Sequence, residues 1–359
     1  MGKSPRLTNT PAIYIDAGRG QVQSTSNDIK FPGVVEFAPV LAPMTTNRAL
    51  KAGDDAPTFS LDIDGRIYVF GTEDVMAHAH PDTVQRLSTS EDQQFTDNYY
   101  YMVAVSLLHA FSARRGNRMF KPRVAVNVPI ELFNNDVKRE QFRAILCSRH
   151  TLVDYDGCEL KVEITEDNLL VLPEGAGAMF YYAFEPEVKR RNPTAGVNVV
   201  IDVGYETTHV LVFYNTDYQR AQSFTIKRAG MGTVARGVTE WLQKSMRGVD
   251  VSMVDAGMME IAGMPRGHRK RIEFAPDTFA DIAPAYDDLV DDLCKRISLE
   301  VNTRIQGSIT RIIPSGGGAF HLNNRFEEAF SNFILAPMKD PNRANVLGLR
   351  LFGESVMEW

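Results

Sequence analysis

Two aspartates stand in the same sequence context, each at the end of an apolar run. Asp16 lies two residues before Gly18, and Asp202 lies two residues before Gly204. The apolar runs predict buried strands, and the glycines allow the backbone to turn sharply into a hairpin. Two such elements half a chain apart predict a duplicated fold. Because backbone N–H groups of the turns could bind phosphate while the carboxylates orient a metal ion, the pattern favours a nucleotide ligand.

A glycine-rich turn follows a third apolar run, at residues 309–313. Residues 315–319 read Ser-Gly-Gly-Gly-Ala. Three consecutive glycines remove every side chain, which a flat base and ribose lying on the backbone would require. A flexible turn is the alternative interpretation, and the two hairpins make the ligand-binding interpretation the stronger one.

A competing motif occurs at residues 230–235, Gly-Met-Gly-Thr-Val-Ala, which match the dinucleotide fingerprint. A Rossmann unit would continue with a core strand closed by an acidic residue about twenty residues on. Asp250 and Asp255 lie at that distance, but residues 247–263 lack the pattern of a core strand. We therefore interpret these glycines as a helix N-terminus that lines the ligand site.

Composition limits the class of protein. A chain of 359 residues is long enough for two domains, and 44% hydrophobic with 23% charged residues is ordinary for a globular protein. The net charge of −6 argues against non-specific coating of nucleic acid. No apolar run approaches the roughly 20 residues that span a bilayer, and the N-terminus lacks the apolar segment of a signal peptide.

The three cysteines show no metal-ligand spacing, which favours a reducing compartment. We therefore expect a cytoplasmic protein without a membrane contact. Cys294 belongs to a helical apolar stripe and is predicted to be a buried hydrophobe.

The expected elements follow from periodicity and turn signals. Residues 31–56 are expected to be irregular surface structure. Strands are predicted at 12–16, 21–24, 61–63, 66–69, 124–128, 158–164, 168–172, 197–203, 208–214, 221–227 and 309–313, with 158–164 and 168–172 forming a pair. Helices are predicted at 97–113, 135–147, 175–184 and after Gly232.

At this point the sequence resembles a known family. The two hairpins and residues 315–319 resemble the phosphate-1, phosphate-2 and adenosine motifs of the actin, sugar-kinase and heat-shock-chaperone ATPase superfamily. Residues 340–349, Asp-Pro-Asn-Arg-Ala-Asn-Val-Leu-Gly-Leu, are similar to the C-terminal signature of bacterial actin-like proteins of the ParM/StbA type. Residues 64–71 resemble their N-terminal insertion hairpin. The resemblance covers almost the whole chain.

The resemblance implies an α/β, actin-like two-domain fold, in which duplicated ribonuclease-H-like mixed sheets flank a nucleotide cleft. Domain I would comprise residues 1–184 and 337–359, with an insertion subdomain at about 31–95, and domain II residues 185–336. The implied ligand is ATP, or GTP, with Mg²⁺. The implied activity is ATP hydrolysis coupled to head-to-tail self-assembly into filaments for plasmid or DNA segregation. A separate DNA-binding adaptor would be needed, because this chain has no basic face for direct nucleic-acid contact.

Matched residue by residue, the resemblance assigns Asp16 and Asp202 to the magnesium ion, through water, and Glu174 to the attacking water. It implies the following nucleotide-binding residues: Gly18, Arg19, Gly20, Gly204, Tyr205, Thr207, Thr208, Lys227, Gly230, Gly232, Ser315, Gly316, Gly317, Gly318 and Ala319. Arg19 departs from the family, in which Ser, Thr or Asn is usual, and it either contacts phosphate or faces solvent. Glu174 could alternatively be a favourable charge at a helix start.

Alternatives from other classes stay open. A small-molecule kinase on the same fold would need a catalytic aspartate and a sugar site, and a nucleotide-gated scaffold would bind without hydrolysis. The basic cluster at residues 266–271 could meet a partner, or be a solvated loop beside the acidic residues of 287–292. The apolar residues of 349–359 could form a membrane-targeting helix, but their acidic neighbours favour packing on the protein.

Overall fold

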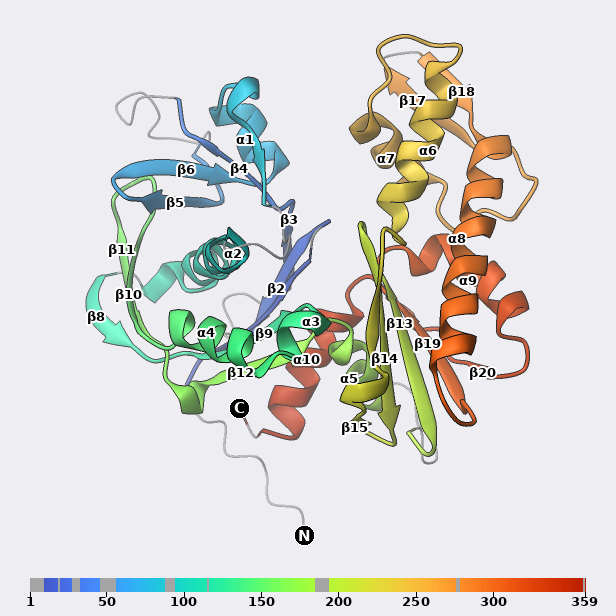
Figure 1. Cartoon of the computed structure of the whole chain (residues 1–359). Helices are drawn as coiled ribbons and strands as arrows, with labels where there is room; N and C mark the ends of the chain where they lie inside the picture. Colours follow the sequence, from blue (N-terminus) through green and yellow to red (C-terminus); the bar gives the residue numbers. More distant parts are fainter. Residues whose placement is uncertain are drawn as a thin grey trace. The chain divides into compact units, whose positions relative to one another are not determined.

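The structure is a computed structural model, and it describes residues 10–18, 20–27, 33–45, 56–87, 94–114, 116–184, 194–275, 278–357 and 359. The chain forms two compact units, residues 1–177 with 346–359 and residues 178–345 (Figure 1). The domain limits expected from the sequence, 184/185 and 336/337, differ from these unit limits by seven and nine residues and stay a prediction.

The first unit is built on a mixed sheet with the strand order β12-β9-β1-β2-β3. Its central strand β1 is antiparallel to β2, which follows it along the chain, and parallel to β9. Both faces of β1 are buried, since Ala12, Ile13, Tyr14 and Ile15 are 0% exposed, which explains its continuous apolar sequence. The strands are β1 (Ala12–Ala17), β2 (Val22–Ser26), β3 (Val34–Phe37), β9 (Arg123–Val128) and β12 (Leu169–Pro173).

The second unit repeats this arrangement. Its central strand β13 is antiparallel to β14, the next strand along the chain, and parallel to β19, and β20 extends the parallel side. The predicted duplication is therefore confirmed, with β13 corresponding to β1. The strands are β13 (Val197–Val203), β14 (Thr207–Tyr214), β15 (Asp217–Tyr218), β16 (Phe224–Lys227), β19 (Arg311–Ser315) and β20 (Ile334–Leu335).

Helix α2 (Gln94–Ala110) is the buried centre of the first unit. It contacts β1 and β2 of the large sheet and also two smaller sheets, through β5 and β10 (Figure 1). Contacts around the helix explain why all residues from 102 to 108 are buried. The smaller sheets contain β4 (Val40–Pro43), β5 (Ser60–Ile63), β6 (Arg66–Phe70), β7 (Gln85–Arg86), β8 (Gly116–Phe120), β10 (Arg149–Val153) and β11 (Glu159–Glu163).

Two expectations for the first unit were wrong. Residues 34–37 and 40–43, expected to be irregular, form β3 and β4, and Pro39 lies between these strands while Pro43 ends β4. Proline is compatible with such strand ends, because no ladder hydrogen bond from its nitrogen is needed there. The predicted pairing of 158–164 with 168–172 does not form, since β11 pairs with β10 and β8 whereas β12 pairs with β9.

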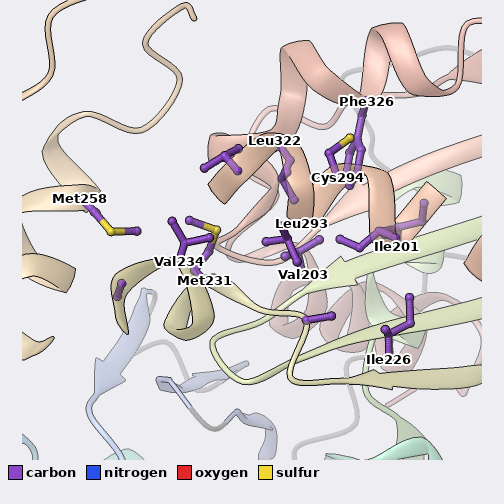
Figure 2. Close-up of a cluster of buried hydrophobic side chains, with 14 of the residues drawn as sticks. Ile201, Val203, Ile226, Met231, Val234, Met258, Leu293, Cys294, Leu322 and Phe326 are labelled. Carbon is purple, nitrogen blue, oxygen red and sulfur yellow. The ribbon is translucent and has the colours of Figure 1, made fainter. Parts of the chain in front are cut away.

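The second unit packs four helices around its sheet core: α6 (Met231–Gln243), α7 (Val251–Glu260), α8 (Ala283–Arg304) and α9 (Ala319–Ala329). Figure 2 shows side chains of α6, α8 and α9 gathered with those of β13 and β16 in one buried cluster, to which Cys294 and Phe326 belong. Cys294 is buried, as predicted. A hairpin, β17 (Arg271–Ala275) and β18 (Thr278–Asp281), packs on α7.

The remaining helices are α1 (Thr72–His78), α3 (Ile130–Phe133), α4 (Asp136–Leu146), α5 (Ala176–Phe184) and α10 (Ala344–Ser355). From α10, Leu349 packs against Tyr14 and Ala125 of the large sheet, and Trp359 joins this cluster. The expected packing of the C-terminal segment on the protein is confirmed for these residues, whereas Val356 is 48% exposed. Among the described residues, no helix has the length and apolar character needed to cross a membrane.

Candidate nucleotide site

Asp202 and the glycine-rich turn lie at the same end of the second unit's sheet. Parallel pairing of β13 with β19 places Asp202 opposite Ser315. Asp202 is buried, and the side-chain amide of Asn345 donates a hydrogen bond from Nδ2 to its Oδ2 at 3.0 Å. The carboxylate is therefore fixed at the point where the glycine-rich turn begins.

Two of the three glycines in this turn are required by the protein's own packing. Gly316 has a φ of +80°, and a Cβ atom there would lie 2.5 Å from the backbone oxygen of Val203 and 2.6 Å from Oδ1 of Asp202. A Cβ atom at Gly318 would lie 2.4 Å from Cγ1 of Val203. These contacts account for Gly316 and Gly318 without a ligand.

Gly317 is different, because a Cβ atom there would meet only the side chain of Asn342, at 3.2 Å. The turn is held at both sides of Gly317 by backbone hydrogen bonds, from Gly316 N to Pro341 O and from Gly318 N to Val203 O, both 2.9 Å. Packing within the protein therefore excludes a side chain at Gly316 and Gly318 but not at Gly317.

The turn after β13 is closed by a hydrogen bond from Gly204 N to Thr207 O at 2.9 Å. Its carbonyl groups then cap helix α6. Met231 N donates to Gly204 O at 3.1 Å, and Gly232 N donates to Tyr205 O at 2.7 Å. The first N–H groups of a helix need such partners, so the turn and the helix N-terminus form one hydrogen-bonded piece.

The close contact between the turn after β13 and the start of α6 requires glycine at positions 230 and 232. A Cβ atom at Gly230 would lie 2.4 Å from Tyr205 O, and one at Gly232 would lie 2.9 Å from Cε1 of the Tyr205 ring. Arg236 of α6 adds two parallel hydrogen bonds to the carboxylate of Glu206, at 3.0 and 3.1 Å, a strong geometry for an ion pair. The expected binding role of Gly230 and Gly232 stays a prediction.

The two threonines of this turn have different surroundings. Thr208 donates its hydroxyl hydrogen to the carbonyl of Ala229, which ties β14 to the segment before α6. The hydroxyl of Thr207 lies 3.3 Å from Nε2 of His209, whose Nδ1 lies 2.9 Å from the hydroxyl of Thr225. Thr208 therefore has a structural bond, and the orientation of the Thr207 hydroxyl depends on the histidine tautomer.

Lys227 ends β16 with an exposed side chain. The guanidinium group of Arg296 donates to the carbonyl groups of Lys227 and Arg228 at 2.8 and 2.9 Å. Arg228 has a φ of +52°, which is uncommon for a residue with a side chain. Arg296 thus holds this short connection in an unusual backbone conformation.

In the first unit, Asp16 is half-buried and its Oδ1 accepts a hydrogen bond from Nδ2 of Asn127 at 3.4 Å. Gly18 lies in the tight turn after β1, where a Cβ atom would be 2.8 Å from the backbone oxygen three residues on. Gly20 is exposed, and Arg19 lies outside the described residues.

Glu174 is a buried carboxylate directly after β12. Its backbone N–H donates to Val128 O at 2.7 Å, which continues the parallel pairing with β9. The hydroxyl of Tyr99, on α2, donates to Oε1 of Glu174 at 3.4 Å. The next residue, Gly175, has a φ of +91°, and α5 begins only after it.

Comparison with known protein families matches both halves of the fold. A family described as "Actin like proteins N terminal domain" matches residues 15–177, and one described as "Archaeal actin homologue MreB-like, C-terminal" matches residues 200–328. The chain is an actin-like protein.

Archaeal relatives share part of the sequence of this actin-like protein. An archaeal actin homolog of Thermoplasma acidophilum is 26% identical over 239 residues, which are 65% of this chain and 68% of that protein. One from Thermoplasma volcanium is 28% identical over 194 residues, or 53% of this chain and 56% of that protein.

Solved structures share the actin-like two-domain α/β fold with mixed sheets. The archaeal actin homolog Ta0583 in complex with ADP has a TM-score of 0.68 at 19% identity, covering 96% of this chain and 99% of that one. A 15-stranded ParM filament from Clostridium botulinum has a TM-score of 0.72 at 18% identity, covering 97% and 99%. At these identities the likeness concerns the fold.

The carboxylates of the candidate residues suit Mg²⁺ better than a metal ion that is coordinated entirely by protein side chains. Among the described residues, no group of three or more His, Cys, Asp or Glu side chains could hold a metal ion. Mg²⁺ usually keeps several waters and binds through one or two carboxylates and substrate phosphates. In the second unit Asp202, oriented by an amide, is a candidate for such a carboxylate, and in the first unit Asp16, half-buried beside Asn127, is another. Their magnesium role stays a prediction.

The basic cluster is partly structural in this actin-like protein. Lys270 was expected in a solvated loop, but its side chain is fully buried and its Nζ lies 3.0 Å from Oδ1 of Asp287. Although burial raises the pKa of Asp287, the N–H of Gly267 and the side chains of Lys270 and Arg325 hold it below its ordinary value. The loop is fixed to α8 because a buried charge requires a partner.

Three residues that the sequence did not indicate contact candidate residues: Tyr99 contacts Glu174 in the first unit, and His209 and Asn345 contact Thr207 and Asp202 in the second. Asn345 stands inside the C-terminal signature at residues 340–349, and His209 directly follows Thr208 of the second hairpin, so the sequence offered a weak signal for both. Tyr99 carried no signal, since it is one tyrosine in an apolar helix.

Proposed function

We propose that this actin-like protein binds ATP with Mg²⁺ and hydrolyses it. The observation that carries the proposal is the β13–β19 register, which brings Asp202 opposite Ser315. A metal-orienting carboxylate and a glycine-rich turn then meet at the carboxyl ends of two parallel strands, where ligands of open α/β sheets bind. The ADP complex of an archaeal actin homolog supports the choice of an adenine nucleotide.

The proposal gives roles to the two phosphate turns, to Gly317, to Glu174 and to the two aspartates. The N–H groups of the turns after β1 and β13, with Thr207, would bind the phosphates, and the backbone at Gly317 would accept the nucleoside. Glu174, whose position Tyr99 helps to fix, would orient the attacking water. Mg²⁺ bound through Asp16 and Asp202 would neutralise charge on the phosphates.

We further propose that ATP binding drives head-to-tail assembly into a filament and that hydrolysis limits its lifetime. The filament structure of a ParM protein with the same fold supports this proposal. A head-to-tail contact that does not close into a ring produces a filament. We also propose a ParM-type role in plasmid or DNA segregation. A separate DNA-binding adaptor would connect the filament to DNA, because the net charge of −6 disfavours direct DNA binding by this chain.

The test measures light scattering and phosphate release together after addition of ATP, GTP or ADP with Mg²⁺. We expect ATP to give scattering that rises and then falls as phosphate is released, and ADP to give little. The Asp202→Ala variant should lose Mg²⁺-dependent phosphate release while keeping the far-UV circular dichroism of the parent.

The alternatives predict other outcomes. Scattering without phosphate release would support a nucleotide-gated scaffold. ATP consumption without scattering, stimulated by a small hydroxylated substrate, would support a kinase. Absence of binding to any nucleotide would overturn the proposal.

A further inference from the structure

Asn345 is buried at the start of α10 and uses both ends of its side-chain amide. Nδ2 donates to Oδ2 of Asp202 at 3.0 Å, and Oδ1 accepts from the backbone N–H of Ala178 at 3.2 Å. All three residues are buried. Asparagine suits this position because its amide offers donors and an acceptor in one short, planar group.

The bond to Asp202 fixes the rotation of the carboxylate. With Oδ2 held by Asn345, Oδ1 faces Gly316, where a Cβ atom would lie 2.6 Å away. Gly316 is itself fixed by the bond from its N–H to Pro341 O, in the segment that leads into α10. The orientation of Asp202 is therefore set by residues on both sides.

The bond to Ala178 satisfies one of the first N–H groups of α5, which have no partner within their own helix. Ala178 and Asn345 are the first and last residues of the second unit. The Asn345 side chain thus links Asp202 to Ala178 by hydrogen bonds. Asn345 and Ala178 are also the residues at which the chain passes from one unit to the other.

We propose that Asn345 is a positioning residue for metal binding, which holds Asp202 in the rotamer that orients magnesium-bound water. The inference rests on the proposed role of Asp202. Partners of metal-orienting groups typically change metal affinity by about 10–100-fold when removed. Loss of the amide should therefore weaken the contribution of Mg²⁺ to nucleotide binding and leave the metal-free interaction nearly unchanged.

The experiment measures the dissociation constant of an ADP analogue with a ribose-linked fluorophore, once with Mg²⁺ and once with EDTA. The proteins are the parent, Asn345→Ala, the milder Asn345→Ser, and Asp202→Ala as reference. We expect the Mg²⁺-dependent gain in affinity to fall by about tenfold or more in both Asn345 variants. Affinity in EDTA should stay within about twofold of the parent, which corresponds to a change of about 0.4 kcal/mol in the free energy of binding.

The control variant is Asn342→Ala, which removes a neighbouring amide whose Oδ1 lies 3.2 Å from the position that a Cβ atom of Gly317 would take. It should retain the Mg²⁺-dependent gain.

Several outcomes would overturn the inference. Equal loss of affinity with Mg²⁺ and with EDTA would make Asn345 structural, as would unfolding of both Asn345 variants alongside a folded Asp202→Ala. A parental Mg²⁺ response in Asn345→Ala, with the response lost in Asp202→Ala, would reject the positioning role alone. If Asp202→Ala also keeps the response, the metal assignment of the proposed function fails with it.

Discussion

The hydroxyl of Tyr99 donates a hydrogen bond to Oε1 of Glu174 at 3.4 Å. Tyr99 is fully buried in α2, and its ring meets the edge of Phe142 at a centroid distance of 6.0 Å. A carboxylate that is buried and hydrogen-bonded has little rotational freedom, which a group that must orient one water molecule requires.

Glu174→Gln should slow phosphate release by about 100-fold, because loss of a positioned acid–base group typically costs 10²–10⁴-fold, while nucleotide affinity changes little. If hydrolysis limits filament lifetime, the variant should assemble with ATP and disassemble more slowly. Phosphate release and scattering decay, measured on the same sample, check this. The control is Glu166→Gln, an exposed glutamate paired with Arg143. A normal hydrolysis rate in Glu174→Gln would leave this residue without a catalytic role.

Tyr99→Phe removes one hydroxyl and keeps the ring that packs on Phe142. A hydrogen bond of about 0.5–1.5 kcal/mol corresponds to a loss of roughly 2–10-fold in the rate of phosphate release, with KM almost unchanged. In the Glu174→Gln background the same substitution should have a smaller effect, because the two residues act as one unit. Additive losses in the double variant would show that Tyr99 acts elsewhere.

The three glycines of the 316–318 turn should respond differently to substitution. Gly317→Val should block nucleotide binding by bulk and lower stability less than a substitution at Gly316 or Gly318, since a Cβ atom there meets only the Asn342 side chain. Gly318→Ala should lower the free energy of unfolding by about 1–3 kcal/mol, because its Cβ would overlap Val203. Fluorescent nucleotide titration and urea unfolding measure the two effects. Parental affinity in a folded Gly317→Val protein would remove the nucleoside assignment.

Acid should destabilise the second unit through His321. Burial first, and then the charge of Arg325, lowers the pKa of His321 to about 4, and its Nδ1 lies 2.6 Å from the hydroxyl of Tyr286. The unfolded state binds this proton near pH 6.5 and the folded state only near pH 4. Stability from the neutral ring is therefore complete above pH 6.5 and falls towards pH 4, by about 3 kcal/mol at about 1.4 kcal/mol per pH unit.

His321→Asn keeps a hydrogen-bond acceptor for Tyr286 but cannot titrate, so its stability should fall less than the parent's between pH 6.5 and 4. Trp241 lies in the second unit and Trp359 in the first. A Trp359→Phe background therefore lets tryptophan fluorescence follow urea unfolding of the second unit alone. Parallel pH dependences in the two proteins would assign the acid sensitivity to other groups.

Much of the fold could be predicted because its central strands carry a local signal. β1 and β13 are continuous apolar runs that end in Asp-x-Gly, and the same strand pairing follows each of them. Strands β3 and β4 could not be predicted, since each has four residues and prolines interrupt the periodicity. Their pairing is decided by neighbours that lie elsewhere in the sequence.

The candidate site, like the fold, could be predicted from the sequence only in part. Asp202 and the glycine-rich turn are visible as local patterns, but the partner of Asp202 lies 143 residues away along the chain. The glycines at 230 and 232 match a ligand-binding pattern, yet their immediate physical reason is close contact with Tyr205. A local motif can require glycine for a ligand or for the protein's own packing, and only the tertiary contacts distinguish the two.

The packing of α10 on β1 has a consequence for synthesis on the ribosome. Leu349 completes the hydrophobic cluster around Tyr14 and Ala125, although the rest of the first unit is translated before the second. While the chain emerges, residues 178–345 can complete their own core before α10 is available, although domains encoded first usually fold first. The face of the N-terminal sheet at Tyr14 and Ala125 therefore lacks the cover of α10 throughout the synthesis of the second unit, and an apolar surface of the first unit is exposed during that interval.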